Sequence, residues 1–147
     1  MKFTYIIFAL LFFNCNSHQE QQNNTFETDK SEILKVLHAQ EDAWNKHDLE
    51  GFMQGYWKSD TLKFYSSSGL KNGWENTLKN YKKGYPTKAE SGTLNFVIND
   101  ISKIEEGNYW VMGEYHLKRP IGDSDGIFII IFKKINGQWK IIADMSC

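Results

Sequence analysis

The chain has 147 residues, a formal net charge of -1 and 24% charged residues, which is typical of one globular domain with a single core. No basic run is longer than a pair such as Lys82-Lys83 or Lys133-Lys134. Nucleic-acid binding needs a concentrated positive footprint, so the composition argues against nucleic acid as a partner.

The first residues have the pattern of an export signal. Met1-Lys2 is a short positive start, and residues 3–13 are apolar apart from Thr4. A membrane-spanning helix takes about 20 residues, so this run fits a secretory signal better. Cys15 follows at once, which resembles a bacterial lipoprotein signal with a lipid-bearing cysteine. Asn14 departs from the small residue usual before such a cysteine, so simple secretion and a buried apolar N-terminus are the alternatives.

This start predicts the domain organisation. We expect a signal peptide over residues 1–14, a flexible tether over 15–28 with lipid attached at Cys15, and a folded domain over 29–147. The tether is polar and rich in Gln and Asn, without apolar periodicity, so it cannot bury enough surface to become ordered. The prediction is therefore a protein of the bacterial cell envelope, secreted to the periplasm or held at the membrane only by its lipid.

Three helices are predicted before the main run of strands. Asp29 followed by Glu32 predicts a capping box. Asp48 predicts the N-cap of a short second helix, and a third helix opens at residues 72–75 and ends before Pro86. After the capping box, one stripe recurs with the period of a half-buried helix: Ile33, Val36, Leu37, Gln40, Ala43 and Trp44.

Strands follow. A first strand is predicted over residues 60–66, and from Gly92 onward the apolar period becomes two. Asn136-Gly137 predicts a type I′ hairpin. Helices followed by antiparallel strands are an α+β layout. Residues 127–132 are apolar on both faces and need cover on both, so we predict a homodimer through the outer sheet face. A protein-interaction module using that face is the alternative.

Four motifs together resemble a known family: Trp44-Asn45-Lys46-His47-Asp48, residues 55–60, Tyr85-Pro86 and residues 137–144. Over residues 31–146 the chain is similar to the SnoaL-like, or DUF4440-type, branch of the NTF2-like superfamily. The resemblance implies a cone in which three N-terminal helices pack on a strongly curved antiparallel sheet, leaving a pocket. It also implies a dimer, because back-to-back sheet dimers are common in this superfamily. It does not fix a reaction, because the fold hosts isomerases, dehydratases, hydrolases and non-catalytic binders.

Acid–base chemistry is the one enzymatic class that the residues favour. The sequence has no GxSxG elbow and no HExxH or paired-histidine spacing, so no serine nucleophile, metal site or cofactor is predicted. The superfamily commonly places a carboxylate or histidine in the apolar cone, and Asp60 and Asp144 lie beside apolar runs expected to reach it. The alternatives are structural: Asp60 satisfies turn amides, and Asp144 faces outward with Lys140.

Aromatic residues make up 15% of the chain, which suits a hydrophobic cavity as well as an ordinary core. Met145 stands where relatives often carry a histidine, and alternation places it with Trp139 and Ile141 toward the pocket, which favours binding over catalysis. The predicted pocket residues are large and mostly aromatic: Trp44, Tyr56, Trp57, Trp74, Tyr81, Tyr115 and Met145.

These features predict a small hydrophobic or aromatic ligand in an aromatic-lined pocket, without an assigned reaction. The alternative is a small acid–base enzyme of isomerase, dehydratase or hydrolase type. In that case Asp60 or Asp144 is the base, and a hydroxyl such as that of Tyr56 or Tyr81 polarises a carbonyl.

Overall fold

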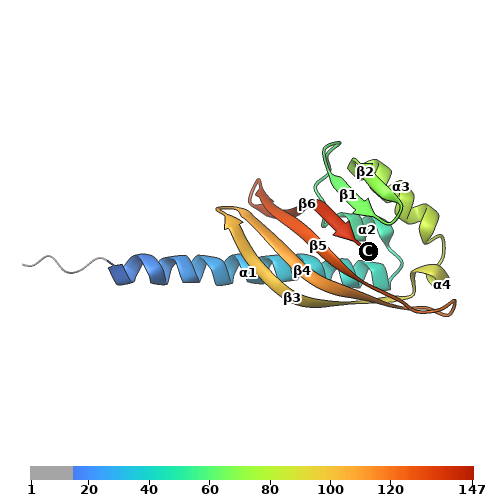
Figure 1. The fold of residues 1–147 in the computed structure, drawn as a ribbon, viewed down its shortest axis with the longest axis horizontal. Helices are drawn as coiled ribbons and strands as arrows, with labels where there is room; N and C mark the ends of the chain where they lie inside the picture. Colours follow the sequence, from blue (N-terminus) through green and yellow to red (C-terminus); the bar gives the residue numbers. More distant parts are fainter. Residues whose placement is uncertain (1–14) are drawn as a thin grey trace, which may run out of the picture.

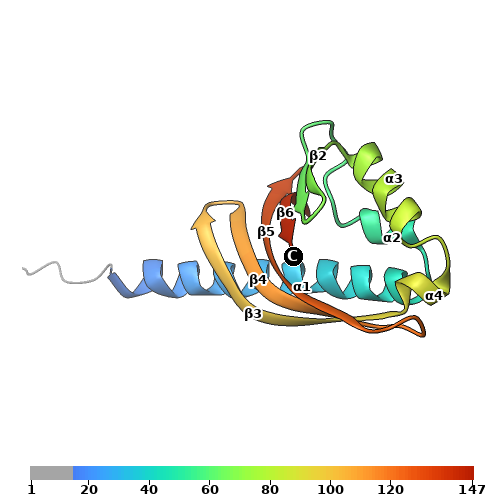
Figure 2. The ribbon, with the colours of Figure 1, turned by 45° about the vertical axis from the view of Figure 1, so that its right-hand side comes forward.

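The computed structural model describes residues 15–147, with side chains described from Thr25 onward, so the predicted signal over 1–14 lies outside the described residues. The α+β prediction is confirmed: helices lie against a strongly curved sheet (Figure 1, Figure 2). No helix in the described part of the chain combines the length and apolarity needed to cross a bilayer. In chain order the elements are α1 (Cys15–Asn45), α2 (Leu49–Met53), β1 (Lys63–Ser66), β2 (Gly69–Asn72), α3 (Trp74–Gly84), α4 (Lys88–Ser91), β3 (Thr93–Glu105), β4 (Asn108–Lys118), β5 (Ser124–Ile135) and β6 (Gln138–Ser146).

The six strands form one sheet in the order β2-β1-β6-β5-β4-β3. All neighbours are antiparallel except β1 and β6, which run parallel, so the sheet is mixed rather than wholly antiparallel as predicted. The partner of β1 is the last strand in the chain, and no local turn signal announces such a pairing. Two short elements, β2 and α4, were not predicted. Strand β2 begins at Gly69, whose φ of 89° allows the tight turn from β1.

Helix α1 lies along the sheet, with its N-terminal part projecting beyond the strands (Figure 1). The predicted stripe is confirmed, since Ile33, Leu37, Gln40 and Trp44 are all buried. However, α1 begins at Cys15, so residues 15–28, expected as a flexible tether, are helical in the structure. Once the packed part of a helix has formed, adding further turns is inexpensive even for polar residues.

Asp29 is therefore not the N-cap that the sequence predicted. Its buried carboxylate accepts hydrogen bonds from the Tyr109 hydroxyl and from Lys134 Nζ, both at 3.2 Å. Lys134 also contacts Glu32, which accepts a hydrogen bond from the indole of Trp139. This cluster ties α1 to β4, β5 and β6 at one end of the sheet. Burial, and then the nearby Asp29, raises the pKa of Tyr109 to about 12.

The two sheet faces have different environments. On β5, Phe128, Ile130 and Phe132 are buried against the helices, whereas Ile127 and Ile129 are exposed on the outer face. The strands are not regular, because register shifts interrupt the β3–β4 and β5–β6 pairings. Such bulges bend a strand and increase its twist, which helps the sheet to curl around the helices.

Candidate functional site

A cavity of about 310 Å³ lies between the concave sheet face and the helices. Aromatic rings from separate elements meet along its wall. The ring centroids of Trp44 and Phe52 are 4.9 Å apart, and those of Phe52 and Tyr81 are 5.2 Å apart, both with edge-to-face geometry. The Trp44 indole donates to the backbone oxygen of Ser91 at 2.8 Å, and this hydrogen bond fixes the orientation of the ring. The result is a largely apolar chamber with rigid walls.

Asp144 on β6 is the one carboxylate side chain in the lining of this cavity. Its side chain is buried, and each oxygen accepts one short hydrogen bond. The Tyr56 hydroxyl donates to Oδ2 at 2.6 Å, and the Ser146 hydroxyl donates to Oδ1 at 2.6 Å. A carboxylate held this firmly by two donors has a fixed orientation toward whatever occupies the cavity.

Burial controls the protonation of this group. Loss of solvent raises the pKa of Asp144 from 3.8 to about 6, although the hydrogen bonds from Ser146 and Tyr56 act in the opposite direction. Burial, and then the charge of Asp144, raises the pKa of both Tyr56 and Tyr81 well above the ordinary tyrosine value. The phenols therefore stay protonated as hydrogen-bond donors, while the carboxyl group exchanges its proton near neutral pH.

The local fold explains why Asp144 faces inward. In the β5–β6 ladder Phe132 pairs with Ile141 and Ile131 pairs with Ala143, so Ile142 is an extra residue in β6. Regular alternation from Ile141 predicts that residue 144 faces outward, and the extra residue reverses this.

The segment before β1 holds the same point of the strand. Ile141 donates its backbone N–H to Gly55 O at 2.9 Å and accepts one from Trp57 N at 2.9 Å. These bonds flank Tyr56, which forms an isolated bridge with Ile141, and so set its side chain beside Asp144.

The same extra residue turns Met145 away. Met145 is 38% exposed and outside the cavity lining, so its predicted place beside Trp139 and Ile141 on the inner face was wrong. Met145 therefore does not make the cavity more apolar, as the sequence had suggested. Asp144 and Ser146 take the inner positions instead.

The other predicted residues divide into two groups. Trp44, Tyr56, Tyr81 and Tyr115 line the cavity together with Asp144. Outside the lining lie four predicted residues: Asp60, Trp57, Trp74 and Met145.

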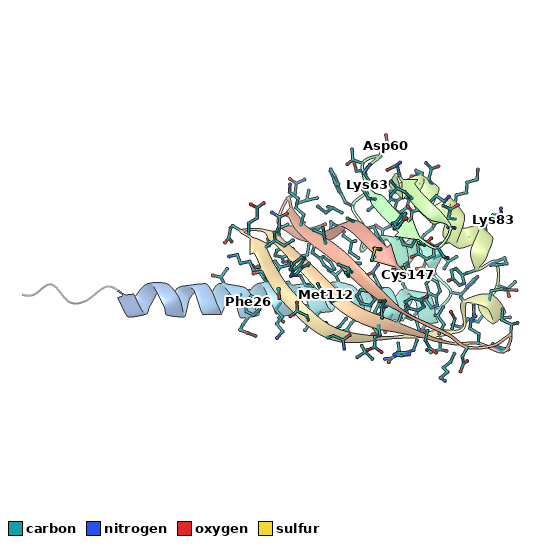
Figure 3. All side chains as sticks on the ribbon, viewed as in Figure 1. Phe26, Asp60, Lys63, Lys83, Met112 and Cys147 are labelled. Carbon is teal, nitrogen blue, oxygen red and sulfur yellow. The ribbon has the colours of Figure 1, made fainter. Side chains whose placement is uncertain are left out.

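Asp60 and Trp74 lie outside the cavity for different reasons. Asp60 is exposed in the loop before β1, and Figure 3 shows it at the edge of the molecule. A carboxylate there cannot serve the cavity. Trp74 is a buried core residue, and its indole donates to the backbone oxygen of Met53 at 2.8 Å.

Several lining residues were not anticipated. Their signal is weak, because each looks like an ordinary core or turn residue until the sheet curls. The rim also carries polar groups from the β1–β2 hairpin. The missed residues include Phe52, Phe64, Tyr85, Phe96, Phe128, Ser66, Ser67, Ser68, Lys71 and Asn80.

No cluster of three His, Cys, Asp or Glu side chains within residues 25–147 is placed to hold a metal ion. The side chains of the cavity combine an apolar chamber, a buried carboxyl group and phenol donors around it.

Comparison with known proteins gives the following result. No family model matches the sequence, and a comparison with curated proteins gives no match. Among solved structures, an NTF-2-like protein of unknown function from Shewanella oneidensis is 38% identical, covering 80% of this chain and 98% of that one, with a TM-score of 0.77.

Two more distant structures share the fold. A candidate scytalone dehydratase from Novosphingobium aromaticivorans is 14% identical, with 84% of this chain and 86% of that chain covered and a TM-score of 0.71. A cystatin-like-fold domain of unknown function from Nostoc punctiforme is 18% identical, with coverages of 81% and 76% and a TM-score of 0.69.

Proposed function

This protein belongs to the NTF2-like superfamily, and we propose that it binds a small, largely apolar or aromatic molecule in the cavity, with a polar group of that molecule on Asp144. The observation that carries the proposal is the combination of an aromatic chamber with one oriented carboxylate. Ligand sites are usually mostly apolar with a few placed polar groups, and volumes from about 300 Å³ upward hold small molecules. The cavity volume of about 310 Å³ therefore selects a compact ligand.

The test uses N-phenyl-1-naphthylamine, a neutral aromatic dye whose fluorescence rises in apolar sites. We expect it to bind the wild-type protein. Ser66 lines the mouth of the cavity, whereas its neighbour Tyr65 is exposed and outside the lining. Ser66→Trp should therefore block the dye, and Tyr65→Trp should not. Equal binding to both variants would show that the dye sits elsewhere and would contradict the proposal.

Native mass spectrometry of the protein purified without added ligand gives a second test. A retained mass of a few hundred daltons, lost from Ser66→Trp and kept by Tyr65→Trp, supports the proposal and identifies the chemistry of the ligand. A retained mass that is equal in both variants argues for binding outside the cavity.

A second function is favoured by one specific observation, the pKa of Asp144 near 6. A general base works best when its pKa lies near the working pH. In this proposal Asp144 removes a proton from carbon or oxygen of the ligand, and the phenol of Tyr81, which interacts with both Tyr56 and Asp144, stabilises developing negative charge. The candidate scytalone dehydratase shares this fold, and one fold hosts many reactions, so the proposal rests on Asp144 and its neighbours.

The enzymatic proposal is tested by deuterium exchange. The retained ligand, or a cyclic ketone that displaces the dye, is incubated with the protein in D2O and followed by NMR. Exchange should rise through an apparent pKa near 6 and disappear in Asp144→Asn. Exchange that persists in Asp144→Asn rules out this residue as the base and leaves the binding proposal standing.

The finer assignments from the sequence also remain proposals. The motif at residues 44–48 and the ending Ala143-Asp144 support the SnoaL-like, DUF4440-type branch. The apolar run before Cys15 supports lipid anchoring at the cell envelope. Metabolic labelling with a palmitate analogue tests the anchor, because Cys15→Ser should abolish the label. Label that survives this substitution contradicts lipidation at Cys15.

We further propose a homodimer through the outer sheet face. In register across the sheet, Tyr65 pairs with Met145, Met145 with Ile129, and Ile129 with Met112. Tyr65 is 50% exposed, Met145 38% and Ile129 36%. Together with exposed Trp110 and Ile127, they form an apolar band, and such bands typically mark interaction surfaces.

A further inference from the structure

The cavity carries opposite charges at its two ends, in a single row of the sheet. On the inner face Lys71 of β2 pairs with Phe64 of β1, and Phe64 pairs with Asp144 of β6. All three line the cavity. Two inter-strand spacings separate the backbones of Lys71 and Asp144 by about 10 Å, with the Phe64 ring between them.

Lys71 is the one lysine or arginine among the cavity-lining residues. Its ammonium group donates to Ser68 O at 3.3 Å, and it forms no ion pair within residues 25–147. Lys82 and Lys118 form ion pairs with Glu50 and Asp123, whereas several surface lysines, like Lys71, form none among the described side chains. Lys71 differs from those lysines because it lines the cavity, where its ammonium group can bind an anionic group of a ligand.

The surroundings of Lys71 suit a carboxylate. Ser66, Ser67 and Ser68 line the same rim, and the hydroxyl groups of Ser66 and Ser68 lie 2.9 Å apart. Hydroxyl groups and an ammonium group supply the donors that an anion needs. Cys147, which bears the chain-terminal carboxylate, also lines the cavity but forms no ion pair with Lys71. At the deep end, ionised Asp144 accepts hydrogen bonds only, so it favours a donor such as a hydroxyl group.

We propose that the ligand of this cavity is an amphipathic monocarboxylate: a flat apolar body lying on Phe64, a hydroxyl group donating to Asp144, and a carboxylate on Lys71 and the serine rim. The inference rests on the proposed function and adds the ligand class and its orientation. The carboxylate stays at the partly hydrated rim, because burying it beside Asp144 would bring two like charges together without water.

The experiment measures displacement of N-phenyl-1-naphthylamine by two compounds of equal length. 4-Hydroxycinnamate carries the carboxylate, and 4-hydroxycinnamamide replaces it with a neutral amide. The proteins are wild type, Lys71→Met, and Lys63→Met as the matched control. Lys63 precedes Phe64 on β1, its side chain is exposed and donates to Asn72, and Figure 3 shows it on the outside of the molecule.

We expect the acid to displace the dye about tenfold better than the amide from wild type and Lys63→Met, the size of a charge-assisted hydrogen bond. The preference should fall to about one in Lys71→Met and weaken in high salt. An acid-to-amide ratio near one in wild type, an unchanged ratio in Lys71→Met, or displacement by neither compound at millimolar concentration overturns the inference. Dye binding in those cases leaves the proposed function intact, whereas a wild-type protein that does not bind the dye removes both.

Discussion

Replacing Asp144 with asparagine should change how the stability of the protein depends on pH. The pKa of Asp144 is about 6 in the folded protein, against 3.8 for an ordinary aspartate. Between these two pH values the folded state holds a proton that the unfolded state has released. The free energy of unfolding therefore falls as the pH rises through this range.

The size of the effect follows from the same two values. Each pKa unit corresponds to about 1.4 kcal/mol, so ionised Asp144 costs about 3 kcal/mol of stability above pH 6 and nothing below pH 3.8. Asparagine has the same shape, can still accept from the Tyr56 hydroxyl, and does not ionise. Asp144→Asn should therefore lack this loss.

The assay is urea unfolding of wild type and variant at several pH values from 4 to 7.5. Titrations common to both proteins cancel in the difference between their free energies of unfolding. Wild type should lose up to about 3 kcal/mol relative to Asp144→Asn across the series. A difference that stays constant within about 0.5 kcal/mol, or that changes in favour of wild type at high pH, would refute the assignment of Asp144 as a buried, desolvated carboxyl group.

Two further predictions follow from the fold. Lys134→Met should cost about 2 kcal/mol, because it removes the cation beside buried Asp29, which keeps only the Tyr109 donor. Lys133→Met should cost about 0.5 kcal/mol or less, and equal losses in thermal unfolding would contradict the role of the cluster. Ile129→Glu should convert a micromolar dimer to a monomer in analytical ultracentrifugation with the fold retained by circular dichroism, and a wild-type monomer would reject the proposed dimer.

The framework of the fold could be predicted from sequence because local patterns control it. The stripe from Ile33 to Trp44 has a helical period, and the alternation along β4 fixes its buried face without knowledge of its partners. The Asn136-Gly137 turn has φ values of 50° and 77°, which its residue types permit at low cost. Each of these signals is contained within a few residues.

The cavity could be predicted only in part because it depends on pairing between distant segments. Tyr56 and Tyr81 were anticipated as pocket-lining aromatic residues. Lys71 and Phe64 were not, since their row with Asp144 exists only because β1 pairs with β6. A parallel pairing between remote strands leaves no local sequence signal. The polar rim of the cavity, formed by the β1–β2 hairpin, could therefore not be predicted from the sequence.

The extra residue in β6 makes the chemistry of the cavity sensitive to chain length as well as to residue identity. Adding one residue downstream of Ile142 moves every following side chain of β6 to the opposite face of the sheet. An insertion between Ala143 and Asp144 would present Met145 to the cavity and turn the carboxylate to the outside, without altering a single side chain. Two chains with the same Asp-X-Ser ending can therefore hold different groups in their cavities. Comparing such chains requires counting residues from the bulge as well as aligning residue types.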